Sequence, residues 1–266
     1  MNKAYDKVKL SRSTTRPTMM DYVEKIFTGF IELHGDRAFG EDAAIVGGVA
    51  LLCGRPVTLI GIQRGRNLEE NIRRNFGSPH PEGYRKALRL MKQAEKFRRP
   101  IITFINTSGA FCGIGAEERG MAEAIARNLL EMSRLRTPVI SLIIGEGGSG
   151  GALGLALADT VWMLSNSTYS VISPEGMASI LWKEPSRAKD AAGIMRITAD
   201  ELLGLGVVER VFEEHPDGAE HGFEALADEI KRALADEAKR LAEMDKEELI
   251  RRRYDRFRGF GEIRDG

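Results

Sequence analysis

A glycine-rich stretch in the middle of the chain, IIGEGGSGGALGLALAD at residues 143–159, matches two motifs with different chemistry. Three of its glycines fit G-x-G-x-x-G, the pattern of loops that hold dinucleotide phosphates. Gly147, Ser149 and Gly151 fit G-x-S-x-G, the turn that presents a nucleophilic serine in hydrolases. The stretch could therefore bind a phosphate, activate a serine, or present its bare backbone to a ligand.

Two kinds of loop bind nucleotide phosphates, the P-loop and the Rossmann loop, and the stretch completes neither pattern. A P-loop needs a lysine after its last glycine so that an ammonium group reaches the phosphates, but Gly150 is followed by Gly151 and Ala152. A Rossmann loop needs an acid at the end of the next strand to bind the ribose hydroxyls. The next apolar run, TVWMLS, continues into Asn166 and Ser167 without an acid. The pattern therefore argues against a nucleotide site.

A serine nucleophile needs a histidine base and an acid that orients the histidine. The histidines that follow Ser149 are His215 and His221, both in the polar segment EEHPDGAEHG, where surface positions are expected. A serine within a run of glycines is typical of a small residue that permits a tight turn. A serine hydrolase stays open as a minor alternative.

The third possibility uses no side chain. An apolar strand, a glycine cluster and a helix start together point the free amides of the first helical turn at one place. The missing side chains let a ligand oxygen approach the backbone closely. Such amides make half of an oxyanion hole, which stabilises negative charge on a carbonyl oxygen. We therefore expect Gly150 and Gly151 to be hydrogen-bond donors.

A second loop of the same design precedes it by one strand–helix unit. INTSGAFCGIGAEERG, residues 105–120, reads as a strand, a loop punctuated by glycines, and a helix opened by acids. Neighbouring parallel strands end at the same edge of a sheet, so the two loops are expected to form a crevice. We expect the amides of Gly113 and Ile114 to face the loop around Gly150.

The elements that position these loops can be read from the hydrophobic pattern. From about residue 99, apolar strands alternate with helices, which favours an α/β fold with a mainly parallel sheet buried on both faces. One long helix is expected in GAEERGMAEAIARNLLEMSRL. Upstream, we expect a helix from Thr18 to Gly35, two strands joined by a tight turn at Cys53–Pro56, and a helix that begins at Pro81.

The chain divides into three regions. Residues 1–17 are polar and unpatterned, as in an arm, residues 18–212 form the core, and residues 213–266 form a C-terminal helical region. The run RRRYDRFR at 251–258 is expected to be a solvated helix face.

Composition excludes several classes of protein. Lysine plus arginine and aspartate plus glutamate both number 39, so net charge indicates no nucleic-acid partner. Cys53 and Cys112 are the only cysteines, which excludes a disulfide framework and a cysteine-rich zinc site, and no other metal site is expected. The sequence contains no run of about 18 apolar residues, so no membrane span is expected. A cytoplasmic location is the expectation.

These loops and their flanks resemble the family of carboxyltransferase alpha subunits of bacterial acetyl-CoA carboxylase, within the crotonase superfamily. The resemblance extends from about Arg16 to Val211. Its matching segments are RPTMMDYVEKIFTGFIELHGDR, NLEENIRRNFG, PEGYRKALRLMKQAEKF, GIGAEERGMAEAIARNL, GEGGSGGALGLALAD and YSVISPEGMASILWK. It implies a crotonase-like ββα superhelix with an N-terminal helix or arm and a C-terminal helical tail.

The resemblance also implies an activity. The family transfers a carboxyl group from carboxybiotin to acetyl-CoA, giving malonyl-CoA for fatty acid synthesis. Biotin is carried on a separate biotin carboxyl carrier protein, loaded by a biotin carboxylase, and a zinc-ribbon beta subunit completes an α2β2 heterotetramer. The biotin nitrogen can itself take the methyl proton, so no protein base is required. Gly113 or Ile114, and Gly150 or Gly151, match the amides that hold the biotin oxygen.

Departures from the family leave alternatives open. Residues 108–113 read SGAFCG where the family has Pro-Gly-Ala-Tyr-Pro-Gly, Ile62 stands where histidine is common, and Met121 where glutamine is usual. Another acyl-CoA such as propionyl-CoA is one alternative substrate. A crotonase-fold hydratase is another alternative. Such an enzyme carries a catalytic glutamate at about the position of Leu153, and a leucine there supplies no acid–base group. A non-catalytic partner subunit is the remaining alternative.

Overall fold

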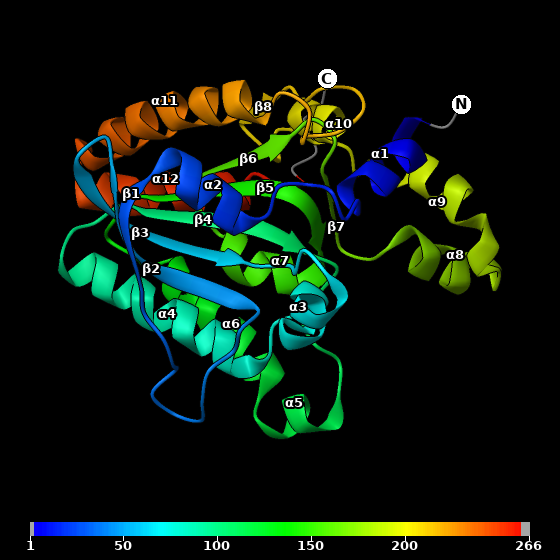
Figure 1. The fold of residues 1–266 in the computed structure, drawn as a ribbon, viewed down its shortest axis with the longest axis horizontal. Helices are drawn as coiled ribbons and strands as arrows, with labels where there is room; N and C mark the ends of the chain where they lie inside the picture. Colours follow the sequence, from blue (N-terminus) through cyan, green and yellow to red (C-terminus); the bar gives the residue numbers. More distant parts are fainter. Residues whose placement is uncertain (1–2, 262–266) are drawn as a thin grey trace.

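Eight strands pair into one sheet in the computed structural model, which describes residues 3–261 (Figure 1). The strands are β1 (Thr28–Glu32), β2 (Ile45–Leu52), β3 (Arg55–Ile62), β4 (Ile101–Thr107), β5 (Val139–Gly148), β6 (Thr160–Leu164), β7 (Thr168–Ser170) and β8 (Arg210–Phe212). Their order is β1-β2-β3-β4-β5-β6-β8, and β7 pairs with the carboxyl end of β5. Only the first two pairings are antiparallel, which confirms the prediction of a mainly parallel sheet.

Helices cover both faces of this sheet. They are α1 (Lys3–Ser11), α2 (Met19–Ile26), α3 (Leu68–Arg73), α4 (Pro81–Lys96), α5 (Ile114–Glu118), α6 (Met121–Met132), α7 (Ser149–Ala156), α8 (Pro174–Trp182), α9 (Ala188–Ile194), α10 (Ala199–Gly204), α11 (Phe223–Ala242) and α12 (Lys246–Arg258), with short 3₁₀ turns at Asn75–Gly77 and Pro185–Arg187. Figure 1 shows α11 on one side of the sheet and α4, α6 and α7 on the other.

Strands β4, β5 and β6 are buried along their whole length because most of their residues are apolar. Leu142 packs in the core beneath α2, α11 and α12, whereas the next residue, Ile143, packs in the core formed with α4, α6, α7 and α10. The same alternation separates Leu59 from Ile60 in β3. Two cores therefore fix β4 and β5 rigidly, and the loops that follow these strands start from a firm base.

The hairpin β2–β3 confirms the predicted tight turn. Cys53 and Gly54 connect the strands with φ angles of 49° and 79°. Positive φ at both central residues is the type I′ arrangement, which matches the twist of paired strands. Arg55 and Pro56, which were expected in the turn, already belong to β3.

The first core helix is shorter than predicted. Helix α2 ends at Ile26, and β1 replaces the expected continuation to Gly35. Phe30 and Ile31 fit a helical spacing, but they lie in β1, which pairs antiparallel with the open edge of β2. The pairing passes through a bulge that contains Gly29, whose φ is 63°. Non-local strand pairing therefore outweighs the local helical pattern.

Two further predictions are wrong in detail. The single long helix expected before residue 135 is two helices, α5 and α6, because Gly120 adopts a left-handed conformation with φ 82° between them. The segment 1–17, expected to lack a pattern, contains α1, whose Val8 packs with Ala192 and Ile197. The division of the chain at residues 17 and 212 stays a prediction.

The C-terminal helices lie against the sheet. Arg253, in the run expected to be solvated, is 1% exposed and forms an ion pair with Asp159 at 2.7 Å. Arg251 in the same run is exposed, as predicted. The pattern of charges in α12 did not reveal which arginine turns inward, because its partner lies 94 residues away in the sequence. In residues 3–261, no helix has both the length and the hydropathy to cross a membrane.

Candidate active site

The two glycine loops meet where β4 and β5 end, as the sequence predicts. β4 and β5 are parallel neighbours. A Cβ atom on Gly148 would lie 2.2 Å from the carbonyl oxygen of Ser108, and one on Gly151 would lie 2.4 Å from the amide nitrogen of Ala110. Neither position has room for a side chain. Glycine at 148 and 151 is therefore required by the close approach of the two loops.

Gly150 has a different reason to be glycine. Helix α7 begins at Ser149, and none of the described side chains caps its first turn, so the amides of that turn keep free hydrogens. A Cβ atom on Gly150 would meet nothing nearer than Ile125 at 3.9 Å. Gly150 also lines a pocket. Its missing side chain therefore gives access to the backbone.

The other predicted donors, Gly113 and Ile114, lie at the start of α5. The ring of Phe111 covers Gly113, with its Cε1 atom 2.7 Å from where a Cβ would be. Ile114 is 80% exposed. Neither residue is among those that line the two pockets described next. Their pairing with Gly150 across one oxygen stays a prediction.

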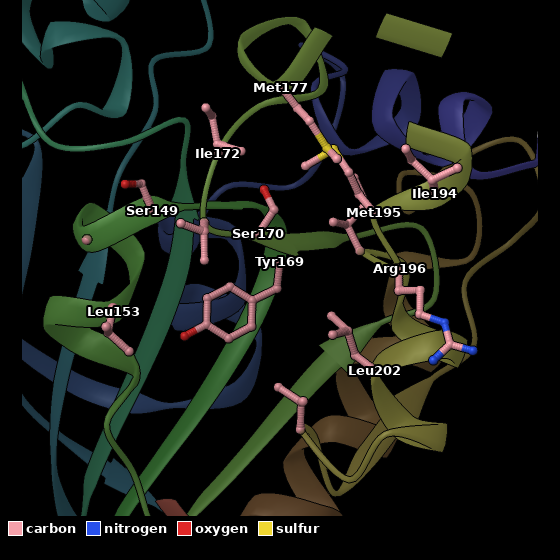
Figure 2. A pocket seen from close by; sticks show the side chains of 14 residues that line it. Ser149, Leu153, Tyr169, Ser170, Ile172, Met177, Ile194, Met195, Arg196 and Leu202 are labelled. Carbon is pink, nitrogen blue, oxygen red and sulfur yellow. The ribbon is translucent and has the colours of Figure 1, made fainter. Parts of the chain in front are cut away.

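An apolar pocket of about 600 Å³ opens beside the first turn of α7 (Figure 2). Its lining is Ser149, Gly150, Leu153, Tyr169, Ser170, Val171, Ile172, Met177, Ile194, Met195, Arg196, Ile197, Leu202 and Val207. Among these side chains only Tyr169 and Arg196 ionise. Burial raises the pKa of Tyr169 to about 12, so its hydroxyl stays neutral near pH 7. The pocket thus offers apolar surface and backbone donors, without an acid–base pair.

Two alternatives from the sequence find little support in this pocket. Leu153 lines it, at the position where a hydratase of this fold would carry its glutamate. His215 and His221, the candidate bases for Ser149, lie in the loop between β8 and α11, where their rings are 5.3 Å apart. Neither histidine lines the pocket. Ser149 does have a φ of 55°, as a nucleophile elbow does, but it lacks the partner.

A second pocket, of about 840 Å³, borders the same loops and is lined by many charged side chains. It lies between the end of α1, the loop after β3, and the ends of β4 and β5. We call it the arginine pocket after the charged residues in its lining, which are Arg12, Arg16, Arg64, Arg66, Glu146 and Glu175.

Glu146, inside the glycine-rich stretch, joins the parts of the arginine pocket. Its carboxylate accepts hydrogen bonds from Arg12 Nε at 2.8 Å and from Arg64 Nη2 at 3.2 Å. Arg12 also pairs with Glu175 of α8 at 2.8 Å. Burial disfavours the charged form of Arg12, but hydrogen bonds to Glu175 and Glu146 more than offset this and raise its pKa. The same contact with Arg12 lowers the pKa of Glu175.

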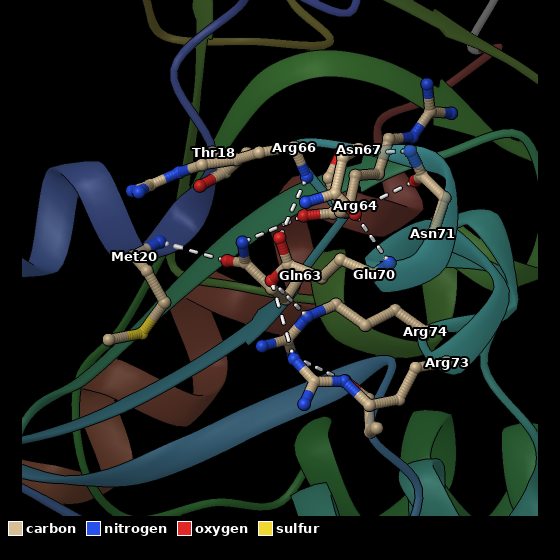
Figure 3. A network of polar contacts seen from close by, with 12 residues as sticks. Thr18, Met20, Gln63, Arg64, Arg66, Asn67, Glu70, Asn71, Arg73 and Arg74 are labelled. Carbon is tan, nitrogen blue, oxygen red and sulfur yellow. Dashed lines mark hydrogen bonds and ion pairs between the residues drawn. The ribbon is translucent and has the colours of Figure 1, made fainter.

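The loop that carries Arg64 and Arg66 is held by α3 (Figure 3). The side chain of Asn71 accepts a hydrogen bond from the amide of Gly65 at 2.9 Å and donates one to its carbonyl at 3.0 Å. Glu70 accepts from the amide of Arg66 at 2.9 Å. The backbone between the two arginines is therefore fixed by side chains of the following helix.

Sequence reasoning missed the arginine pocket. Arg12 and Arg64 lie 134 and 82 residues from Glu146, so no local spacing connects them. One signal in the sequence could have pointed to this pocket. Glu146 is an acid within the glycine-rich stretch, and a buried carboxylate needs a positively charged or hydrogen-bonding partner.

A group that could bind a metal lies elsewhere. Among residues 3–261, Glu32, His34 and Glu41 bring ligand atoms within 4.8 Å of one another. Glu41 already accepts hydrogen bonds from the amide of Gly35 and the ammonium of Lys86. The three residues line neither pocket, so they add no metal to the candidate site.

Comparison with known proteins connects these features to a family. A model of the acetyl co-enzyme A carboxylase carboxyltransferase-like family matches residues 2–261. The acetyl-coenzyme A carboxylase carboxyl transferase subunit alpha of Clostridium acetobutylicum is 56% identical over 259 residues, which are 97% of this chain and 94% of the relative. The same subunit of Streptococcus sanguinis is 58% identical, covering 95% of this chain and 97% of the relative.

One relative is longer. A Natranaerobius thermophilus protein named acetyl-coenzyme A carboxylase carboxyl transferase subunits beta/alpha is 58% identical over 257 residues. The match covers 97% of this chain and 42% of that protein, so the chain spans less than half of it.

Solved structures share the fold at low identity. Transcarboxylase 12S, with methylmalonyl-coenzyme A and methylmalonic acid bound, aligns with a TM-score of 0.68 at 19% identity, over 90% of this chain and 45% of that chain. A Pseudomonas malonate decarboxylase hetero-tetramer in complex with coenzyme A aligns with a TM-score of 0.66 at 17% identity, over 81% and 86%. These likenesses concern the fold and confirm the predicted crotonase-like architecture.

Proposed function

The chain belongs to the acetyl co-enzyme A carboxylase carboxyltransferase-like family, and from this premise we propose that it acts as the alpha subunit of a carboxyltransferase. The reaction moves a carboxyl group from carboxybiotin to acetyl-CoA and forms malonyl-CoA. A zinc-ribbon beta subunit in an α2β2 heterotetramer, a biotin carboxyl carrier protein, a biotin carboxylase and a cytoplasmic location belong to the proposal. The name of the fused relative supports the beta partner.

The apolar pocket and the amide of Gly150 suit the head group of biotin. When bound, biotin supplies a carboxyl group activated on a ureido nitrogen. The N–H of Gly150, at the positive end of α7, can donate a hydrogen bond to an oxygen that gains negative charge. Leu153, Ile172 and Met177 line the pocket around it, and can pack on apolar ring atoms and exclude water (Figure 2).

One observation carries the proposal: a free backbone amide borders an apolar pocket that lacks an acid–base pair. Hydrolases and hydratases need a side chain to move a proton. Carboxyl transfer between biotin and an acyl-CoA can proceed with donors that stabilise charge, because the reactants exchange the proton themselves. The chain then has to bind, orient and stabilise, which backbone amides can do.

Reconstitution tests this function. The chain is purified alone and together with a zinc-ribbon beta subunit, and malonyl-CoA turnover is measured with and without biotin. We expect turnover only in the complex, and only with biotin. Parallel assays with acetyl-CoA and propionyl-CoA compare the acyl groups. Full turnover by the chain alone, or a complex whose turnover ignores biotin, would refute the proposal.

Ser149→Ala separates backbone chemistry from serine chemistry. We expect kcat of the complex to change by less than about threefold, because the lining of the pocket that Ser149 borders contains no histidine to activate the hydroxyl. Ser149→Gly serves as the control, since glycine also accepts the positive φ at this position. A drop of several orders of magnitude in Ser149→Ala, with the fold intact, would revive the serine mechanism.

A further inference from the structure

Both ends of helix α5 are attached to the start of helix α4. Phe111, shortly before α5, donates its backbone amide to the carbonyl of Pro79 at 2.9 Å. Arg119, directly after α5, forms an ion pair with Glu82 at 3.0 Å. The carbonyl of Arg119 also accepts a hydrogen bond from Arg85 at 2.9 Å. The predicted donor amides at the start of α5 therefore lie between two fixed points.

His80, which directly precedes α4, takes part in both attachments. Its ring packs against the ring of Phe111, with the two centroids 4.2 Å apart and an interplanar angle of 31°. Its Nδ1 atom lies 3.2 Å from Nη2 of Arg119. A guanidinium has donors and no acceptor, so this Nδ1 atom carries no hydrogen and accepts the bond. One imidazole ring thus links the residue before α5 to the residue after it.

The ring of Phe111 connects His80 to the backbone that carries a predicted donor. Its Cε1 atom lies 2.7 Å from where a Cβ atom on Gly113 would be. The same ring packs against the buried cluster that contains Tyr84 and Ala116. A change in the position of Phe111 would therefore move the backbone at Gly113.

Helix α4 also contacts the loop that carries Gly150. The hydroxyl of Tyr84, which is fully buried, donates a hydrogen bond to the carbonyl of Gly151 at 3.0 Å. Tyr84 lies about one helical turn after His80 along α4. One helix therefore holds both glycine loops. Two donors stabilise one oxygen only when both lie at hydrogen-bond distance from it, so the spacing of the loops matters.

We propose that His80 is a positioning residue, which holds the amides of Gly113 and Ile114 in place relative to the amide of Gly150. The inference rests on the proposed function, in which these amides stabilise the oxygen of biotin. His80 lines neither pocket, so it acts through the loop and not on the reactants. Misplacing a group in an active site by about 1 Å can cost about 10²-fold in rate.

Hydrogen exchange of the full chain, followed by mass spectrometry, tests the attachment without catalysis. His80→Ala removes the ring that packs on Phe111 and the acceptor for Arg119. We expect the hydrogen-bonded amides of Phe111, Ala116 and Glu117 to exchange about threefold faster or more, because local opening becomes easier. His80→Phe keeps an aromatic ring and should restore part of the protection. Unchanged exchange in His80→Ala overturns the inference.

Two further variants secure this test. His34→Ala is the matched control, because His34 has a side chain that is 64% exposed and lines neither pocket. It should leave the exchange of residues 111–117 and kcat unchanged. Phe111→Leu removes the same ring contact from the other side and should have the effects of His80→Ala, so the test survives if His80→Ala unfolds.

Kinetics of the reconstituted complex connect the attachment to the reaction. We expect His80→Ala to lower kcat about tenfold or more with an unchanged KM for acetyl-CoA, and His80→Phe to recover part of kcat. The unfolding temperature should stay within about 3 °C of the wild type, whereas a merely structural residue would lower it without this loss of kcat. Wild-type kcat in His80→Ala overturns the inference and leaves the proposed function intact. An inactive wild-type complex refutes the proposed function, and the exchange measurement then still decides whether His80 holds the loop.

Discussion

Gly150→Val is expected to lower kcat of the carboxyltransferase complex by about 10²- to 10³-fold, the usual cost of losing one oxyanion donor. A β-branched side chain at this position lies over the free amides of the first turn of α7. The protein should still fold, because a Cβ atom on Gly150 has 3.9 Å of clearance from Ile125. Initial-rate assays of malonyl-CoA turnover and a thermal unfolding curve measure both effects.

Neighbouring glycines provide the controls for this variant. Gly151→Val should lower the unfolding temperature as well as activity, because its Cβ would lie 2.4 Å from the backbone of Ala110. Gly204→Ala in α10 should leave activity unchanged, since nothing lies within 4 Å of the added methyl group. A folded Gly150→Val complex with wild-type kcat would remove Gly150 from the mechanism.

Arg253→Met is expected to reduce the free energy of unfolding by about 3–5 kcal/mol, as the loss of one member of a buried ion pair does. Arg253 binds Asp159 at 2.9 and 2.7 Å and donates to the carbonyls of Met132, Leu135 and Thr137. Its removal leaves a charged carboxylate and three carbonyls without this partner. Denaturant unfolding monitored by circular dichroism measures the loss.

A second substitution shows whether the stranded charge causes the loss. Burial raises the pKa of Asp159, and the charge and hydrogen bonds of Arg253 offset part of that rise. The double variant Arg253→Met, Asp159→Asn should therefore be more stable than Arg253→Met alone. Arg251→Met on the exposed side of α12 should cost less than about 0.5 kcal/mol. Equal stability of Arg253→Met and Arg251→Met would show that the buried ion pair between Arg253 and Asp159 does not stabilise the fold.

Local patterns predicted the part of the fold that holds the glycine loops. Apolar runs bounded by glycine and proline predicted β4 and β5, and Pro81 marked the start of α4. The place where the two loops meet followed from the rule that parallel neighbours end at one edge of the sheet. The spacing of the glycines did not show which of them bind and which of them permit packing. The structure shows that Gly148 and Gly151 are needed for the close approach of the two loops.

Contacts between distant segments account for what the sequence did not reveal. β1 forms because it can pair with the open edge of β2. Helix α1 is held by the packing of Val8 against Ala192 and Ile197. Arg253 is buried because it forms an ion pair with Asp159. The arginine pocket joins α1, the loop after β3 and the end of β5. None of these pairings leaves a periodic signal within one segment.

The central claim is that the backbone N–H of Gly150, and no side chain of the loop, stabilises the negative charge that forms during transfer. Replacing Gly150 by glycolic acid converts its amide to an ester and removes only that donor. Because this N–H lies in the first turn of α7, it has no acceptor within the helix, and folding should be preserved. We predict a loss in kcat of about 10²-fold or more with an unchanged unfolding temperature. An ester-containing complex as active as the wild type would contradict the account.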